Sequence, residues 1–335
     1  MWPCVDRVYF FSVMKTRNLW KKQRGFTLIE LMVAMGIAIL IMAMLVGITN
    51  VAMGAWQRSR AEVRASRQAK TMLDAMAKDL ECFVMRSGNV NEWLSARTEP
   101  NLPGSSRDRS TNAAEFIFFS AASDRYRGGA GTAADLGGDV CTVSYKLAYQ
   151  DPLQGLDNNN STFVFYRQLV DPRPTFDTLL GRPDLRTAFA ASAGNNRFEN
   201  QATAGANNTD AKYNFMCENV YQYSITFRVD VPSVAGGSNV VRPVRVTLGQ
   251  NANANNFRLY GNQIDTDASV GGGMTVSNQE IRAGRLTGVE ISITVISDFG
   301  INQLKQRTFS SPQAKAQFLA QHSYEFSKSV DLPGM

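Results

Sequence analysis

One acidic side chain stands alone in a long apolar run near the start of the chain. From Gly25 to Gln57, Glu30 is the only ionisable residue. A carboxylate just inside a lipid-facing helix is costly unless it is hydrated or paired with a cation. The residue types therefore indicate either a carboxylate solvated at the headgroup level or one member of a buried ion pair, and position alone leaves both readings open.

Basic residues crowd the chain just before this run, and a glycine and an aromatic residue separate the two. The stretch from Lys21 to Leu31 reads KKQRGFTLIEL. It resembles the processing signal of type IV pilins and type II secretion pseudopilins, and the close resemblance covers about residues 20–83. The resemblance implies that a prepilin peptidase cuts between Gly25 and Phe26 and methylates the new amine of Phe26. Glu30 is then the fifth residue of the mature chain.

The resemblance implies a specific ion-pair partner for Glu30, the N-terminal amine of Phe26 in a neighbouring subunit. Cleavage would leave a positive amine on Phe26, and helices packed side by side would bring Glu30 of one subunit to the amine of its neighbour. Buried charges need such partners. We therefore expect Glu30 to act in assembly with other pilin-like subunits.

The leader and the apolar run predict two N-terminal segments. Residues 1–25 form a basic leader. Met14 is an alternative start of translation, because a leader that begins there has the length typical of the family that the chain resembles. Residues 26–57 form a transmembrane helix: Leu31 to Ile48 is 18 residues without a polar side chain, about 27 Å as a helix and close to the thickness of bilayer hydrocarbon. Basic residues lie on both sides, so charge alone does not fix the orientation. The resemblance implies a single pass of the bacterial inner membrane with the C-terminal domain in the periplasm, or extraction into a filament.

Residues 58–85 continue the helix with an amphipathic pattern. Apolar residues recur at helical spacing, while charged residues fall off that stripe. The stripe consists of Ala69, Met72, Leu73, Met76, Leu80 and Phe83. This pattern predicts a helix whose second half packs on a globular head.

Residues 86–335 predict a β-rich head, so that the whole chain is α+β, a long helix followed by an antiparallel sheet. Alternating or apolar runs predict six strands, at 115–120, 140–149, 162–170, 220–229, 241–248 and 289–295. Pro243 restricts the fifth to a sheet edge or a strand start. Residues 86–112 read as a loop, and the polar stretches near 187–214 and 249–280 as surface insertions. Ser311 and Pro312 predict the start of a short helix that runs through Gln321.

Charge and residue counts exclude several classes of function. The formal net charge is +6, but residues 1–25 carry +5 of it, so nucleic-acid binding is not expected from charge. His322 is the only histidine, which excludes a histidine triad or a multi-histidine metal site within one chain. The glycine-containing stretch at 129–134 lacks the βαβ context of a dinucleotide-binding fingerprint. We expect no cofactor and no enzyme activity.

Two weaker sites remain open. Asp265 and Asp267 are calcium candidates, although they lack the glycine and distal glutamate of an EF-hand loop. Cys82, Cys141 and Cys217 would remain after cleavage. They allow one disulfide in an oxidising compartment, but we favour three small buried side chains.

The leading functional hypothesis is a minor pilin-like or pseudopilin-like structural subunit of an envelope filament. The chain resembles the J-type minor pseudopilins in the Asp79-Leu80 pair that ends the helix and in two strands late in the sequence. The Verru-Chthon cassette proteins resemble it in size and in their Asn-rich insertions. The alternative is a binding module at a filament tip or cell surface, contacting an exoprotein, DNA or a surface. A membrane-tethered enzyme is disfavoured, since no catalytic set of residues is evident.

Overall fold

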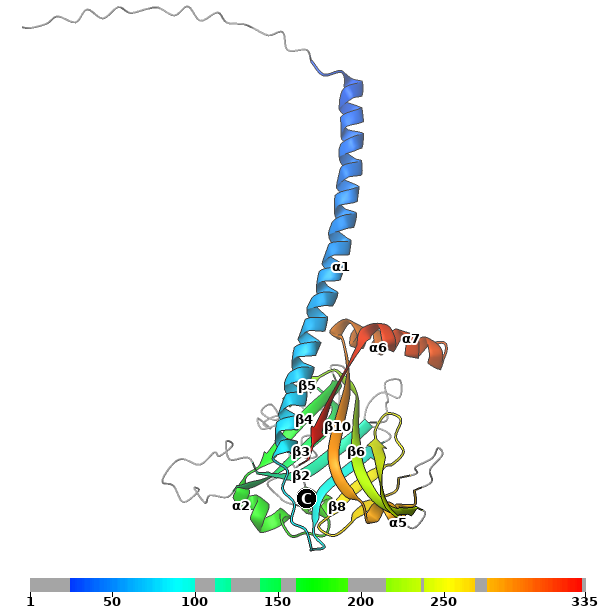
Figure 1. Cartoon of the computed structure of the whole chain (residues 1–335). Coiled ribbons are helices and arrows are strands. Elements are labelled where there is room, and N and C mark those ends of the chain that lie inside the picture. The colour runs from blue at the N-terminus through cyan, green and yellow to red at the C-terminus, as the bar shows by residue number, and fades with distance from the viewer. Residues whose placement is uncertain are drawn as a thin grey trace, which may run out of the picture. The chain divides into compact units, whose positions relative to one another are not determined.

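The computed structural model describes residues 25–99, 112–121, 139–151, 161–191, 215–235, 238–268 and 276–332. The leader up to Arg24, the glycine-containing stretch at 129–134 and most of the polar stretch at 187–214 lie outside these residues. The chain divides into two compact units, Met1–Trp56 and Gln57–Met335. A single helix, α1 (Leu28–Glu81), passes from the first unit into the second (Figure 1).

The described part of the first unit is the apolar beginning of α1. Within this helix an 18-residue window has a mean hydropathy of 2.8 and none of it is buried. Its large side chains are more than half exposed, as at Leu40 (62%) and Met44 (68%). A helix this long and apolar can cross a bilayer, and lipid would remove from water the apolar surface that the protein leaves uncovered.

The second half of α1 packs into the head, as its amphipathic pattern predicts. All six residues of the apolar stripe are buried, and Ala65 and Ala77 extend it. The off-stripe charges other than Asp79 are exposed, including Arg58, Arg67 and Lys78. The 3.6-residue period therefore separates a core face from a polar face.

The larger of two antiparallel sheets has seven strands in the order β5-β4-β3-β2-β1-β8-β9. In chain order these strands are β1 (Glu92–Glu99), β2 (Asn112–Ala121), β3 (Val140–Gln150), β4 (Thr162–Val170), β5 (Phe215–Glu218), β8 (Asn256–Tyr260) and β9 (Ile264–Thr266). Strand β4, expected from its apolar run to be central, is nearly all buried and lies between β3 and β5.

The smaller sheet has four strands in the order β11-β10-β6-β7. They are β6 (Val220–Ala235), β7 (Ser238–Leu248), β10 (Arg285–Ile296) and β11 (Ser323–Asp331). Pro243 lies on β7, an edge strand, as expected of a residue that cannot donate to a ladder on both sides. Together, a long helix and antiparallel sheets confirm the α+β class.

Short helices connect and flank the strands. They are α2 (Pro172–Pro174), the π-helical turn η2 (Thr175–Leu179), α3 (Leu185–Ala191), α5 (Asn278–Arg282), α6 (Asp298–Gln306) and α7 (Pro312–His322). The expected start of α7 is confirmed, because the Ser311 hydroxyl accepts a hydrogen bond from the amide of Ala314 at 3.2 Å.

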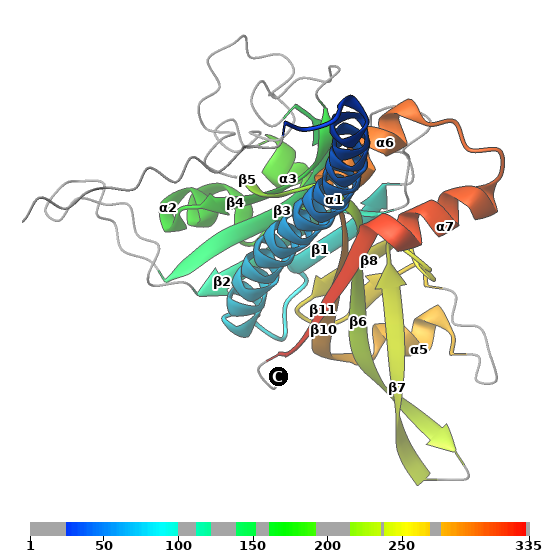
Figure 2. The same cartoon turned by 90° about the horizontal axis from the view of Figure 1, so that it is seen from above.

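Aromatic side chains fill the space between the two sheets. Phe165 of β4 meets Tyr223 of β6 edge-on at 4.8 Å between ring centroids, and Phe227 of β6 stacks on Phe257 of β8 at 3.9 Å. Tyr145 of β3 stacks beside Phe165 on the same face. The end of α1 also packs on this face, beside the smaller sheet (Figure 2). Helices α2, α3 and turn η2 lie against the opposite face, where the Thr175 hydroxyl of η2 accepts from the amide of Thr142 at 3.1 Å.

A buried ion pair fixes the end of α1 on the larger sheet. The Asp79 side chain is 0% exposed, and Arg167 of β4 donates to it from Nε at 2.8 Å and from Nη2 at 3.2 Å. The Tyr145 hydroxyl of β3 donates to the same carboxylate. The Ser120 hydroxyl of β2 donates to the Asp79 carbonyl at 2.9 Å. One turn of the helix is thereby bonded to three neighbouring strands.

Two regions differ from the sequence-based expectation. The supposed loop at 86–112 contains β1, the strand between β2 and β8, and the supposed insertion near 249–280 contains β8, β9 and α5. Both β1 and β8 carry a charged residue for a physical reason: Arg258 pairs with Glu92, whose side chain is 0% exposed. A charged residue such as Glu92 or Arg258 does not predict a buried strand unless its distant partner is known.

The three described cysteines are consistent with the favoured reading. The structure forms no disulfide among Cys82, Cys141 and Cys217, and the last two are buried. Burial, with a smaller effect of the Glu218 charge, raises the pKa of the Cys217 thiol to about 12. This thiol is therefore protonated at neutral pH and chemically inert.

We predict that Asp79→Ala lowers the free energy of unfolding of the fragment Gln57–Met335 by about 3–5 kcal/mol, because it leaves Arg167 without its buried partner. Urea denaturation followed by circular dichroism measures this change. Asp177→Ala is the matched control. Asp177 forms an ion pair with Arg173 in which both side chains are about two-thirds exposed, and the loss of this pair should cost less than about 1 kcal/mol. Equal effects of the two substitutions would contradict an anchoring role for Asp79.

Candidate processing and assembly site

The residues predicted to be cut, methylated and paired lie together at the start of α1. Gly25 and Phe26 precede the helix, in extended or irregular backbone, and the Phe26 side chain is 86% exposed. Nothing lies within 4 Å of a Cβ placed on Gly25. The bond between the two residues is therefore open to a peptidase, and glycine is not required there by the chain's own packing.

Glu30 closes the first turn of α1 by reciprocal hydrogen bonds with Thr27. The Thr27 amide donates to Glu30 Oε2 at 2.9 Å, and the Glu30 amide donates to the Thr27 hydroxyl oxygen at 3.3 Å. The Thr27 hydroxyl also donates to Oε2 at 2.9 Å. This arrangement is a capping box, which satisfies amides that the first turn of a helix leaves without partners.

The capping box gives Glu30 a role that the sequence analysis missed. The signal was available, since a threonine followed three residues later by glutamate before an apolar run is the sequence form of this motif. Only Thr27, among the described residues, hydrogen-bonds to the Glu30 carboxylate, and it uses Oε2. Oε1 is consequently left to accept from a cation of another chain without dismantling the cap.

Farther along α1, a second polar contact joins the helix to the larger sheet and to α6. Arg64 pairs with Glu218 of β5 and, at 3.4 Å, with Asp298 at the start of α6. Asn219 completes the group, donating to Asp298 Oδ1 at 2.6 Å and accepting from the Thr162 hydroxyl at 2.7 Å. This group lies where the globular head begins, so it positions the head on the helix rather than doing chemistry.

The remaining sequence candidates do not assemble into a centre. Asp267 accepts hydrogen bonds from the amides of Asn255 and Asn256 at 2.8 and 3.0 Å, and Asp265 pairs with Arg282 at 3.4 Å. Over the described ranges, no group of three or more His, Cys, Asp or Glu residues could hold a metal. Calcium binding at the two aspartates stays an untested expectation, and both carboxylates already have protein partners.

The sequence favours a surface or helix-capping position for His322, and in the structure this residue is half-buried. It ends α7 with its ring 4.6 Å from that of Phe318 and 5.6 Å from that of Phe299. Burial, together with the charge of Arg58, lowers the pKa of this imidazole. The residue is therefore neutral at physiological pH and serves packing.

Comparison with known protein families finds a match that falls on this site. Residues 20–46 match the family model described as the prokaryotic N-terminal methylation motif. The matched range includes Gly25, Phe26, Thr27 and Glu30. Comparisons with curated proteins and with solved structures give no match. The motif supports a processed subunit of the pilin or pseudopilin type, and the apolar helix that carries it supports membrane anchoring.

Proposed function

We propose that the chain is a minor pilin-like or pseudopilin-like structural subunit of an envelope filament, of the type II secretion or type IV pilus kind. The observation that carries the proposal is the continuity of α1: one helix bears the methylation motif, then an exposed apolar surface, then the face that packs into the head. A subunit of a helical filament needs all three on one rigid element, because its helix must leave the bilayer for a bundle of like helices while the head follows.

The partners follow from the same arrangement. A prepilin peptidase cuts after Gly25 and methylates Phe26, and the bilayer holds the apolar part of α1 until neighbouring subunits replace lipid. The protein passes the bacterial inner membrane once, with its head in the periplasm. Neither a J-type pseudopilin nor a Verru-Chthon cassette protein is favoured over the other by the fold.

A second role, as a binding module at a filament tip, is compatible with the first. A polar pocket on the head, separate from the N-terminal site, favours it. An enzymatic role has less support, since the described residues include no group of three or more His, Cys, Asp or Glu side chains that could hold a metal ion.

We predict that the mature protein begins at an N-methylated Phe26. Mass spectrometry of the N-terminal peptide from cells with an active prepilin peptidase measures this directly. Gly25→Val should leave the leader attached, because a branched side chain at the cut site obstructs the peptidase, whereas Gly25→Ala should be partly cut. Recovery of wild-type protein with its leader intact would overturn the proposed processing.

We predict that the charge of Glu30, rather than its capping hydrogen bonds, drives assembly. Glu30→Gln keeps an acceptor for Thr27 and removes the charge, whereas Glu30→Leu removes both. Both variants should insert and be processed. Both should also co-purify with other pilin-like subunits at least tenfold less than wild type, since an unpaired buried amine costs about 3–5 kcal/mol.

Thr27→Ala is the matched control, because it weakens the cap by about 1 kcal/mol and leaves the charge in place. It should assemble nearly as wild type does. If Glu30→Gln assembles normally while Thr27→Ala and Glu30→Leu fail, the residue acts through the helix cap and charge pairing between subunits is wrong for this protein.

A further inference from the structure

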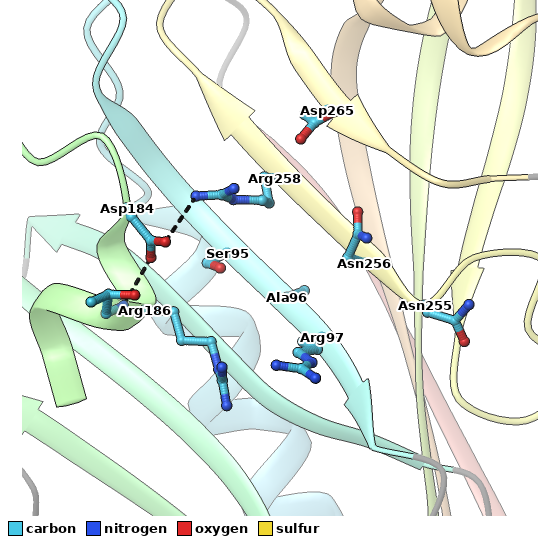
Figure 3. Close-up of a pocket in the computed structure, with 10 residues that line it drawn as sticks. Ser95, Ala96, Arg97, Asp184, Arg186, Asn255, Asn256, Arg258 and Asp265 are labelled. Atoms are coloured by element: carbon cyan, nitrogen blue, oxygen red, sulfur yellow. Dashed lines mark hydrogen bonds and ion pairs between the residues drawn. The ribbon is translucent and has the colours of Figure 1, made fainter.

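A polar pocket of about 390 Å³ opens on the head, and all of its lining residues belong to the second unit. Strand β1 provides its floor, β8 and β9 one wall, and the beginning of α3 the other (Figure 3). Its lining consists of Ser95, Ala96, Arg97, Asp184, Arg186, Thr187, Asn255, Asn256, Arg258 and Asp265. The volume is within the range of roughly 300–1,000 Å³ found for small-molecule sites.

One buried carboxylate holds both walls in place. Glu92 accepts from Arg258 Nε at 2.7 Å and Nη2 at 3.0 Å, which fixes the guanidinium of the β8 wall. The same carboxylate accepts from the amide of Leu185 at 2.6 Å, which fixes the first turn of α3. The Glu92 amide also donates to the carbonyl of Arg182 at 3.0 Å. The pocket is therefore preorganised, and a ligand would not have to order its walls.

Positive charge gathers at one end of the pocket. Arg97 of β1 and Arg186 of α3 extend to neighbouring positions there (Figure 3), and both lie beside Glu115 of β2. Arg186 donates to Glu115 at 2.9 Å, and Arg97 is opposite Glu115 in the strand register. The Arg97 side chain is exposed, and among the described residues no ion pair or hydrogen bond engages its guanidinium. One carboxylate cannot neutralise two guanidinium groups, so this end attracts an anionic group.

The rest of the pocket offers mixed donors and acceptors. Hydrogen bonds and charge from Thr187 and Arg258 lower the pKa of Asp184 although burial opposes the shift, so this carboxylate is ionised at neutral pH. Asp265 adds a second carboxylate, while the Ser95 hydroxyl and the Asn256 amide supply neutral groups. Two carboxylates repel a densely charged polyanion, and they accept well from hydroxyl groups.

We propose that this pocket binds an acidic saccharide, with the sugar carboxylate on Arg97 and Arg186 and the hydroxyls on Asp184, Ser95 and Asn256. A uronic acid has both features in one small molecule: one anionic group and several hydroxyls that each donate and accept. A neutral sugar would leave the guanidinium end unpaired, and an acidic peptide side chain would leave the hydroxyl-binding end unpaired. The inference does not rest on N-terminal processing, because the pocket is complete whether or not the leader is removed.

Isothermal titration of the full chain in detergent tests the proposal with galacturonic acid and its short oligomers as probes. Galactose is the neutral comparison with nearly the same hydroxyls, acetate supplies the carboxylate alone, and a triglutamate peptide supplies an acidic protein segment. The uronate probes should bind at least about tenfold more tightly than each of the three. Failure of the uronates to bind, or equal or tighter binding of galactose, acetate or triglutamate, would overturn the assignment.

Two substitutions locate the binding. Arg97→Gln should weaken uronate binding about tenfold or more, because hydrogen bonds to charged groups contribute roughly 1.5–3 kcal/mol. Arg285→Gln removes another exposed arginine, on β10, which does not line the pocket, and should leave binding unchanged. Asn256→Asp keeps the side-chain shape, adds a repelling charge to the pocket and should also weaken binding. Unchanged affinity in both pocket variants, with unaltered thermal unfolding, would place the saccharide elsewhere and refute the proposal.

Discussion

The carboxylate of Asp79 is the constraint from which the arrangement of the head follows. A charge with no exposure has to be paired, and the pairing with Arg167 and Tyr145 holds one face of α1 against the larger sheet. Once that rotation of the helix is fixed, Met72 and Met76 lie in the core, and Arg64 on another face reaches Glu218 and Asp298. The apolar stripe alone would tolerate sliding, whereas a buried, bidentate ion pair has one geometry.

The same helix meets two different surroundings along its length. In its apolar first half the large side chains are more than half exposed within the described protein, a surface that suits lipid or the apolar faces of other helices. At the very start, Glu30 caps the first turn with one oxygen and leaves the other available. In the assembly proposed above, the same residue would order the start of the helix and offer a charge to a neighbouring subunit. The first role is local and the second requires a neighbour.

Glu92 fixes the walls of the pocket through a buried ion pair, as Asp79 fixes the end of α1 on the larger sheet. Each is a fully buried carboxylate paired with an arginine from a distant strand, and each also connects to a second element. Burying a carboxylate in this way contributes less to net stability than to a unique arrangement of its partners. In the head, that arrangement yields a pocket with fixed walls, which the exposed side chain of Arg97 also lines.

The sequence by itself predicted the processing junction, and it determined the extent of α1, its buried stripe and the strands with strong alternation, such as β6 and β10. These features depend on local order: period, charge and capping chemistry act between residues a few positions apart. It did not determine β1 or β8, because Glu92 and Arg258 look like surface residues until a contact across 166 positions neutralises both. The edge strand β11 was not predicted for a related reason: nearly all of its residues are exposed or half-buried, and it is ordered by pairing with β10. Only the tertiary structure decided these elements, because a buried charge is stable only beside its partner, and no local pattern specifies which distant residue that partner is.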